Sequence, residues 1–177
     1  MNATSLLLRC REGDSLALDE FVRRYQPVIE RLALAVLDDG RQEMQEEVQD
    51  VRGVVQDTLA AAVAAGELFR DENDLTIWMY ATGLKACQKR LRRRSRLVGS
   101  TGSAAGETPD GPSGSQRLAM RAAVRQLDEK LRLPLLLHYS SGLSLSEVAQ
   151  VLKVSQSSIQ ARMVSAREKM RVFLEVG

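Results

Sequence analysis

The 177-residue sequence is poor in the residues that build metal centres and disulfides. It holds two cysteines far apart in the chain, Cys10 and Cys87, and one histidine, His138. Structural zinc sites need several Cys and His side chains at short spacings, so this composition excludes such a site and favours two buried, reduced thiols. We expect no metal and no cofactor.

Aromatic residues are also scarce, at 4% of the chain against 44% hydrophobic residues in all. This balance favours helices packed through Leu, Ala and Val rather than an aromatic-rich β-sandwich. No apolar run approaches the roughly 20 residues that cross a bilayer, and the first residues lack the basic start of a signal peptide. The sequence therefore predicts an all-α, soluble, cytoplasmic protein without a membrane partner.

Nothing in the sequence resembles the side-chain sets that carry out catalysis. There is no Gly-rich phosphate loop, no pair of catalytic carboxylates and no nucleophile beside a base. His138 lies in the Leu-rich stretch LLLHYSSG, which is typical of a residue in or beside a helical core. We therefore expect a protein that is not an enzyme.

A segment rich in small residues divides the chain. Residues 99–116 contain five Gly, four Ser and two Pro in 18 positions, a composition that predicts a flexible linker. The sequence thus predicts two domains, 1–98 and 117–177. The second domain carries 10 Lys and Arg against 5 Asp and Glu, a net charge of +5 that favours an acidic partner such as nucleic acid.

The first domain reads as a series of helices. Apolar residues recur every three or four positions after Asp14, which is placed to cap a helix, and Pro27 indicates a kink or a new start within it. Residues 38–50 are polar and acidic, and a second helix follows to about Gly66. Asp74 is placed to cap a third helix, which we expect from about Leu75 onward.

The third helix ends in the most basic stretch of the chain, KACQKRLRRRSR at residues 85–96, with seven basic and no acidic side chains. Lys85, Lys89, Arg92 and Arg96 step by four, three and four positions, so they form one stripe on the helix. A solvated helix face usually mixes both signs of charge. Seven uncompensated positive charges therefore favour a phosphate-binding surface over a simple solvated face.

The second domain contains the pattern of a helix-turn-helix. Ser144 or Ser146 is placed to cap the first helix, Lys153 and Val154 form the turn, and Ser155 is placed to cap the second helix. Ile159, Met163, Ala166 and Met170 mark the buried face of that second helix. Its first two turns are then free to enter a major groove, although two ordinary packed helices would give a similar pattern.

Taken in order, these segments resemble the ECF (extracytoplasmic-function) sigma factors, small two-domain members of the sigma-70 family of bacterial RNA polymerase subunits. VVQDTLAAAV resembles the segment that docks on the β′ clamp helices of the polymerase. The stretch from LFRDENDLTIW to the basic helix resembles the part that opens and holds the −10 element. QLDEKLRLPLLLHYSSGLSLSEVAQVLKVSQSSIQARMVSAREKMR is similar to the domain that reads the −35 element.

The resemblance implies a sigma factor that binds core RNA polymerase, through the β′ clamp helices and the β flap, and promoter DNA, with a possible anti-sigma factor as a further partner. The implied polymerase-docking residues are Val55, Gln56, Asp57 and Leu59. The implied −10 residues are Asp71, Asn73, Thr76, Lys85, Lys89, Arg92, Arg93 and Arg96. The implied −35 residues are Ser155, Gln156, Ser157, Ser158, Gln160, Arg162 and Arg167.

Within this set, Asn73 is the first candidate to hold a base flipped from the opened strand, because it offers both a donor and acceptors to a base edge. Gln156 and Gln160 are suited to adenine.

Some positions depart from the family pattern. Arg52 and Gly53 stand where acidic residues usually precede the docking segment, and Lys153 stands where the turn usually has Gly. Pro134 is expected to interrupt a helix that is normally continuous. Two other functions therefore stay open: a docking or regulatory module that binds polymerase or an anti-sigma factor without melting promoters, and a free-standing helix-turn-helix regulator.

Overall fold

The computed structural model describes residues 3–38, 40, 44–66, 69–97 and 112–176. All of its regular elements within these ranges are α-helices, so the predicted all-α class is confirmed. The chain forms two compact units, Met1–Leu37 with Gln45–Gly99 and Asp38–Met44 with Ser100–Gly177. None of the helices in the described ranges is long and apolar enough to cross a membrane.

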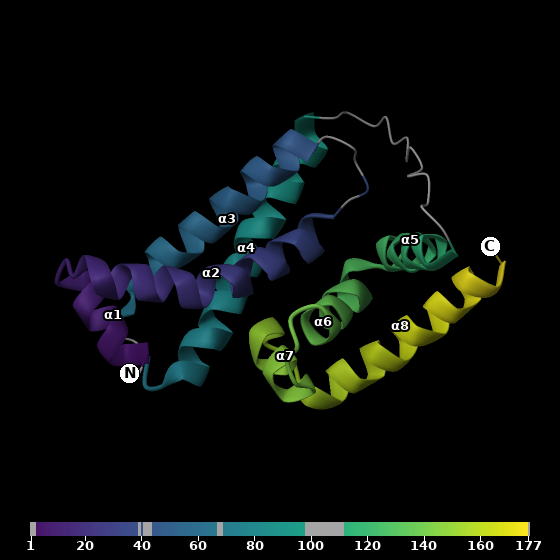
Figure 1. Ribbon diagram of the computed structural model, residues 1–177. Helices are drawn as coiled ribbons and strands as arrows, with labels where there is room; N and C mark the ends of the chain where they lie inside the picture. The colour runs from purple at the N-terminus through teal and green to yellow at the C-terminus, as the bar shows by residue number, and fades with distance from the viewer. Residues whose placement is uncertain (1–2, 39, 41–43, 67–68, 98–111, 177) are drawn as a thin grey trace. The chain divides into compact units, whose positions relative to one another are not determined.

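The N-terminal unit contains four helices: α1 (Ala3–Arg11), α2 (Ser15–Leu37), α3 (Met44–Ala64) and α4 (Glu72–Leu97) (Figure 1). The central helix α2 packs on both α1 and α4. Asp14 caps it as predicted, since its carboxylate accepts hydrogen bonds from the backbone N–H groups of Leu16 (3.0 Å) and Ala17 (3.1 Å). α2 is one helix through Pro27, so no new helix starts there.

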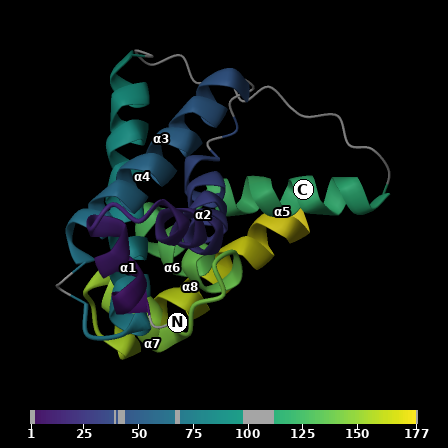
Figure 2. The same ribbon diagram turned by 60° about the vertical axis from the view of Figure 1, so that its left-hand side comes forward.

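Helices α3 and α4 run in opposite directions, approach each other at Gly83 and diverge toward the start of α3 (Figure 2). Asp50, near the start of α3, pairs with Arg94 near the end of α4. Asp57 lies further along α3 and pairs with Arg90, which comes earlier in α4. Gly83 of α4 permits this close approach. A Cβ atom on Gly83 would lie 3.1 Å from Leu32 Cδ2, 3.5 Å from Thr58 Oγ1 and 3.6 Å from Ile29 Cγ2. Gly83 is therefore where α4 meets both α2 and α3.

An apolar stripe of α4, in which residues recur every three or four positions, faces the core of this unit. Tyr80, Leu84 and Cys87 are buried, whereas Ile77 and Leu91 at its two ends are half-buried. Burial raises the pKa of the Cys87 thiol to about 12, and the nearby Arg90 only partly opposes this shift. Burial, and next the charge of Glu72, raise the pKa of Tyr25 to about 12.

These two groups predict a loss of stability at alkaline pH. Below pH 9 both are protonated in the folded and unfolded states, so they add no pH dependence. Between the ordinary thiol pKa of 9.0 and about 12, the unfolded state releases the Cys87 proton first. The free energy of unfolding should then fall by on the order of 1 kcal/mol per pH unit. Urea unfolding at pH 8 to 10.5 measures this slope, and Cys87→Ala should flatten it; an unchanged slope would contradict the assignment.

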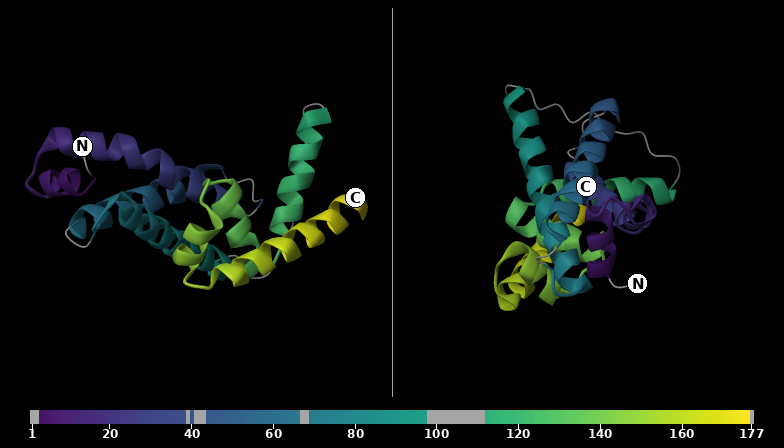
Figure 3. Two further views of the ribbon diagram at one scale, coloured as in Figure 1. Left: turned by 90° about the horizontal axis from the view of Figure 1, so that it is seen from below. Right: turned by 90° about the vertical axis from the view of Figure 1, so that its left-hand side faces the viewer.

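The C-terminal unit contains α5 (Pro112–Arg125), α6 (Glu129–Tyr139), α7 (Leu145–Leu152) and α8 (Gln156–Val176). The long helix α8 packs against the other three (Figure 3). α6 is continuous through Pro134, so the predicted interruption is wrong. The ring of Pro134 is buried in a run of buried leucines, and this packing opposes the loss of one backbone hydrogen bond.

The linker predicted at 99–116 is only partly open to comparison. Residues 99–111 lie outside the described residues. Residues 112–116 are the start of α5, because Pro112 occupies the first helical position, where its missing N–H costs nothing. Helix α5 thus begins within the predicted linker, whose bounds stay a prediction.

Candidate nucleic-acid interfaces and docking groove

The helix-turn-helix of the C-terminal unit is held by caps at both of its helices. Ser144 and Glu147 form a reciprocal capping box at the start of α7. Ser155 accepts a hydrogen bond from the backbone N–H of Ser158 (3.2 Å) at the start of α8. Of the two caps that the sequence allowed for α7, the structure thus selects Ser144.

The turn between α7 and α8 contains the one non-glycine residue with positive φ in the described part of the chain. Lys153 has φ 54° and ψ 47°, the left-handed conformation, and its N–H bonds back to the carbonyls of Ala149 and Gln150. This conformation crowds a side-chain Cβ against the backbone, which is why glycine usually occupies such positions.

Lys153→Gly should therefore stabilise the C-terminal unit. Relief of the Cβ contact, less the extra unfolded-state entropy of glycine, should add about 0.5–1 kcal/mol. Amide hydrogen exchange of α7 and α8 in the full chain measures this gain. Lys153→Ala is the matched control, because it removes the same charge but keeps the Cβ atom. A gain from alanine equal to that from glycine would show that charge, not backbone strain, is responsible.

The first turns of α8 present polar side chains to solvent. Ser155, Gln156, Ser157 and Gln160 are exposed, whereas Ser158 and Arg162 are half-exposed. Ile159, Met163, Ala166 and Met170 form the buried stripe of the same helix, as predicted. At about 100° per residue, the residues predicted to contact DNA flank this stripe on both sides, so they are spread around the accessible part of the helix.

Arg167, further along α8, has a partner that the sequence did not indicate. Its Nη2 donates a hydrogen bond to the phenol oxygen of Tyr139 (2.7 Å), and its guanidinium carbon lies 6.0 Å from the centre of that ring. The Tyr139 ring in turn stands edge-on to His138. Arg167 is therefore held in a fixed direction on the exposed side of the unit.

In the N-terminal unit, the start of α4 differs from the prediction. The helix begins at Glu72, so the segment 72–76 is helical rather than a loop. Asp71 is its cap, accepting a hydrogen bond from the backbone N–H of Asp74 (2.8 Å), and Asp74 instead pairs with Arg70 (2.7 Å). The hydrogen bond from Arg70 holds the pKa of Asp74 below its usual value. Asp71 is the better cap because it precedes the first helical turn.

Because α4 begins at Glu72, the predicted base-binding residues Asn73 and Thr76 lie in its first turns, and Asp71 lies just before it. Asn73 lies exposed in the first turn of α4, and its side chain has no hydrogen bond to another described residue. Thr76 donates its hydroxyl hydrogen to the carbonyl of Glu72 (2.8 Å), and the Asp71 carboxylate acts as the cap. Asn73 is therefore the one of the three whose side chain is available without breaking a hydrogen bond to the described chain.

Five basic residues of α4 form an exposed surface, which we call the basic face. All five are exposed, and none pairs with an acidic side chain among the described residues. The basic face consists of Lys85, Lys89, Arg92, Arg93 and Arg96. Such a surface attracts phosphate groups, and binding would release the counterions held along a nucleic acid.

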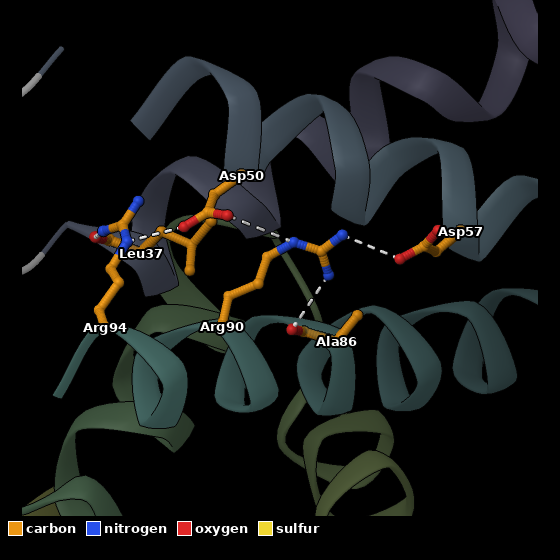
Figure 4. Close-up of polar contacts among 6 residues, drawn as sticks. All are labelled: Leu37, Asp50, Asp57, Ala86, Arg90 and Arg94. Carbon is orange, nitrogen blue, oxygen red and sulfur yellow. Dashed lines mark hydrogen bonds and ion pairs between the residues drawn. The ribbon is translucent and has the colours of Figure 1, made fainter. Parts of the chain in front are cut away.

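The other two arginines of the basic stretch are compensated within the unit, so the prediction of seven uncompensated charges is wrong (Figure 4). Arg94 pairs with Asp50 (2.7 Å) and Arg90 with Asp57 (2.8 Å), both on α3. Arg90 also lies 3.6 Å from Asp50. No local sequence pattern indicates these pairs, because the partners are separated by 33 to 44 positions along the chain.

A largely apolar groove of about 630 Å³ lies on the N-terminal unit. It is bounded by Cys10 of α1, by Phe21 and Val22 of α2, and by one side of α3. Three of the predicted docking residues, Val55, Gln56 and Leu59, line it. The fourth, Asp57, does not line it, because its carboxylate pairs with Arg90 of α4.

Comparison with known proteins agrees with this arrangement. Residues 117–170 match the family model "Sigma-70, region 4". The chain is 26% identical to the ECF RNA polymerase sigma-E factor of Escherichia coli, over 92% of this chain and 89% of that protein. It is 25% identical to the RNA polymerase sigma-H factor of Pseudomonas aeruginosa, over 96% and 92% of the two chains.

Two solved structures share the fold. CnrH, in complex with the cytosolic domain of CnrY, superposes with a TM-score of 0.68 at 25% identity, over 98% of this chain and 97% of CnrH. The sigma factor RpoE of Bartonella quintana, in complex with the anti-sigma factor NepR, gives a TM-score of 0.67 at 20% identity, over 90% and 97%. The chain thus contains a sigma-70 region 4 at residues 117–170, and over most of its length it is similar to proteins named as ECF sigma factors.

Proposed function

We propose that this chain binds core RNA polymerase and directs it to promoters that carry a −35 and a −10 element. The observation that carries the proposal is the helix-turn-helix, which lies within the match to sigma-70 region 4 and exposes the first turns of α8. Sigma factors position the polymerase and leave the chemistry to it, so the chain itself acts in the cytoplasm as a specificity subunit and not as an enzyme.

In this proposal the C-terminal unit reads the −35 element. The first turns of α8 enter the major groove, where Gln156 and Gln160 offer the paired donor and acceptor that adenine requires. Ser155, Ser157 and Ser158 contact phosphates at the helix start, because its free N–H groups and dipole favour negative charge there. Arg162 and Arg167 extend this positive surface along the helix.

The N-terminal unit holds the −10 element. The basic face of α4 lies along the phosphate backbone, and its charges are exposed and uncompensated within the described unit. Asn73, at the start of the same helix, is placed to bond the edge of an unstacked base, with Asp71 and Thr76 beside it. Because a flipped base loses its stacking energy, these hydrogen bonds are needed to hold it.

The groove on α3 is the proposed docking site for core polymerase. Val55 and Leu59 supply apolar contacts and Gln56 a polar one, which suits the β′ clamp helices as partner. Asp57, with a side chain 66% exposed, lies outside this groove and pairs with Arg90 of α4. The C-terminal unit would contact the β flap.

An anti-sigma factor is a further proposed partner. The structurally similar RpoE was solved with the anti-sigma factor NepR, and CnrH with the cytosolic domain of CnrY. A protein that covers the groove or the basic face would keep this chain from polymerase or DNA. Such a regulator would compete with core polymerase for the free chain.

Reconstitution with bacterial core RNA polymerase tests the proposal. The holoenzyme is incubated with genomic DNA fragments, and the 5′ ends of the transcripts are mapped. We expect new, discrete start sites that share a −10 and −35 pair and that disappear when the chain is omitted. Gel filtration of the same mixture reports whether the chain binds core polymerase.

Two other results would overturn the proposal in different ways. Tight core binding without new start sites would favour a docking or regulatory module that does not melt promoters. Absence of core binding, together with binding of duplex DNA by the chain alone, would favour a free-standing helix-turn-helix regulator.

A further inference from the structure

Three residues on one face of α3 form a small notch. Asp50, Gly53 and Asp57 are separated by three and four positions, so they lie in line along the helix. The two acids stand above and below the glycine, which has no side chain. Glycine weakens a helix interior relative to alanine, so its place between two acids calls for a local reason. We call this feature the Gly53 notch.

The guanidinium of Arg90 lies between Asp50 and Asp57 (Figure 4), and it fills the Gly53 notch. A Cβ atom on Gly53 would lie 2.5 Å from Arg90 Nη2 and 3.3 Å from its Cζ, too close for any side chain to coexist with the arginine in this position. Arg90 thereby reaches Asp57 at 2.8 Å and Asp50 at 3.6 Å, and it donates to the carbonyl of Ala86 (3.3 Å). Its side chain is 19% exposed.

The Gly53 notch suits a planar group with several hydrogen-bond donors, such as a guanidinium. The guanidinium lies against the backbone of α3 and faces acids on both sides, whereas a lysine ammonium is a single point of charge. Asp50 is shared, because it also pairs with Arg94 (2.7 Å), one turn further along α4. Two successive turns of α4 are therefore fastened to α3 through one face.

This fastening acts together with the buried apolar stripe of α4 to set which way the rest of the helix faces. At about 100° per residue, Lys85, Lys89, Arg92 and Arg96 fall within about 60° of one another around the helix. By the same geometry, Arg90 and Arg94 lie about 150° from the middle of that group. A rotation of α4 about its axis would therefore turn the basic face away from its present direction.

We propose that Arg90, seated on Gly53 between Asp50 and Asp57, is a positioning residue that fixes the rotation of α4 so that the basic face meets promoter DNA. This inference rests on the proposed function. Arg90 itself does not contact DNA in this arrangement. Because Asp57 lies on α3, which carries the proposed docking groove on another face, the same contacts join the polymerase-docking helix to the DNA-binding helix.

The test uses substitutions that leave the net charge unchanged. Gly53→Ala fills the notch with one methyl group, and Arg90→Lys keeps the charge but removes the planar fork. Both are assembled with core polymerase on a promoter recovered by transcript mapping, and the dissociation constant is measured at several salt concentrations. Arg23→Lys, at an exposed arginine of α2, is the matched control.

We expect Gly53→Ala to weaken the promoter complex about 3- to 10-fold and to lower its salt slope by about one, since one phosphate contact moves out of reach. In the double variant Gly53→Ala with Arg90→Lys, the slimmer lysine leaves space for the alanine methyl group. The fold loss of promoter affinity in the double variant should therefore be smaller than the product of the fold losses in the two single variants. Such non-additivity is the signature of direct contact between two residues. A merely structural role would lower the urea midpoint of the free chain without changing the salt slope.

The results also separate this inference from the proposed function. If the wild-type holoenzyme initiates and Gly53→Ala matches it in affinity and salt slope, the positioning role is wrong and the proposed function stands. Independent losses in the double variant would likewise overturn the role of the notch. If the wild-type chain forms no promoter complex with core polymerase, both proposals fall together.

Discussion

Replacement of Gly83 by leucine should destabilise the N-terminal unit by about 2–3 kcal/mol. The Cβ atom alone would lie 3.1 Å from Leu32 Cδ2, and the rest of the side chain would have to displace α2 or α3. Leucine is a better helix former than glycine by up to about 1 kcal/mol, but overpacking at a three-helix contact outweighs that gain. Urea unfolding of the full chain, followed by helical circular dichroism, measures the loss.

Ser95→Leu is the matched control for this experiment. Ser95 lies on the same helix but is exposed, so the same side chain meets solvent there, and the expected change is within about 0.5 kcal/mol. Gly83→Ala should fall between the two, because Leu32 needs to move by only a few tenths of an ångström. Equal stability of Gly83→Leu and Ser95→Leu would show that α4 is not in close contact at Gly83.

The sequence predicted best those features that depend on neighbours along the chain. The cap of α2 by Asp14, the cap of α8 by Ser155 and the buried stripe from Ile159 to Met170 all follow from local hydrogen bonds and helical periodicity. The left-handed turn at Lys153 was also indicated, because two helices of a helix-turn-helix need a sharp turn between them. These signals operate within a few residues, and tertiary packing left them unchanged.

Features that depend on packing could not be predicted in the same way. The basic stretch 85–96 reads as uniformly charged, yet its arginines divide between two faces because α3 supplies acids to one of them. Helix α6 continues through Pro134, because the burial of this proline and its neighbouring leucines outweighs the loss of one backbone hydrogen bond. Asp74 was predicted to cap α4, but the helix begins at Glu72, so that Asp71 is the cap. In each case the deciding partner lies outside the local pattern.

The seven positive charges of residues 85–96 fall into two groups with different expected roles. Of its seven positive charges, two are used within the unit to hold α4 against α3, and five remain on the basic face. A substitution on the basic face should therefore change phosphate contacts while leaving the fold intact. A substitution at Arg90 or Arg94 should change the fold first.

Arg92→Ala combined with Arg93→Ala should weaken the promoter complex of the holoenzyme at least about tenfold. Each phosphate contact contributes about 0.9 to the slope of log affinity against log salt concentration, so loss of two should lower that slope by about 1.8. The effect should be similar for different promoters, because phosphate contacts carry no sequence information. Filter binding or fluorescence anisotropy at about 50 to 300 mM salt, where affinity for nucleic acid falls steeply with salt, measures both quantities.

Arg23→Ala combined with Arg31→Ala removes the same charge from exposed positions on α2 and serves as the control. It should leave the salt slope within error of wild type, because a general change in net charge does not create or remove a specific phosphate contact. Weaker binding by the Arg92 and Arg93 variant with an unchanged slope would contradict phosphate contact by the basic face. An equal fall in slope for both variants would instead assign the effect to net charge, and the direction in which α4 presents its basic side chains would then have no part in promoter binding.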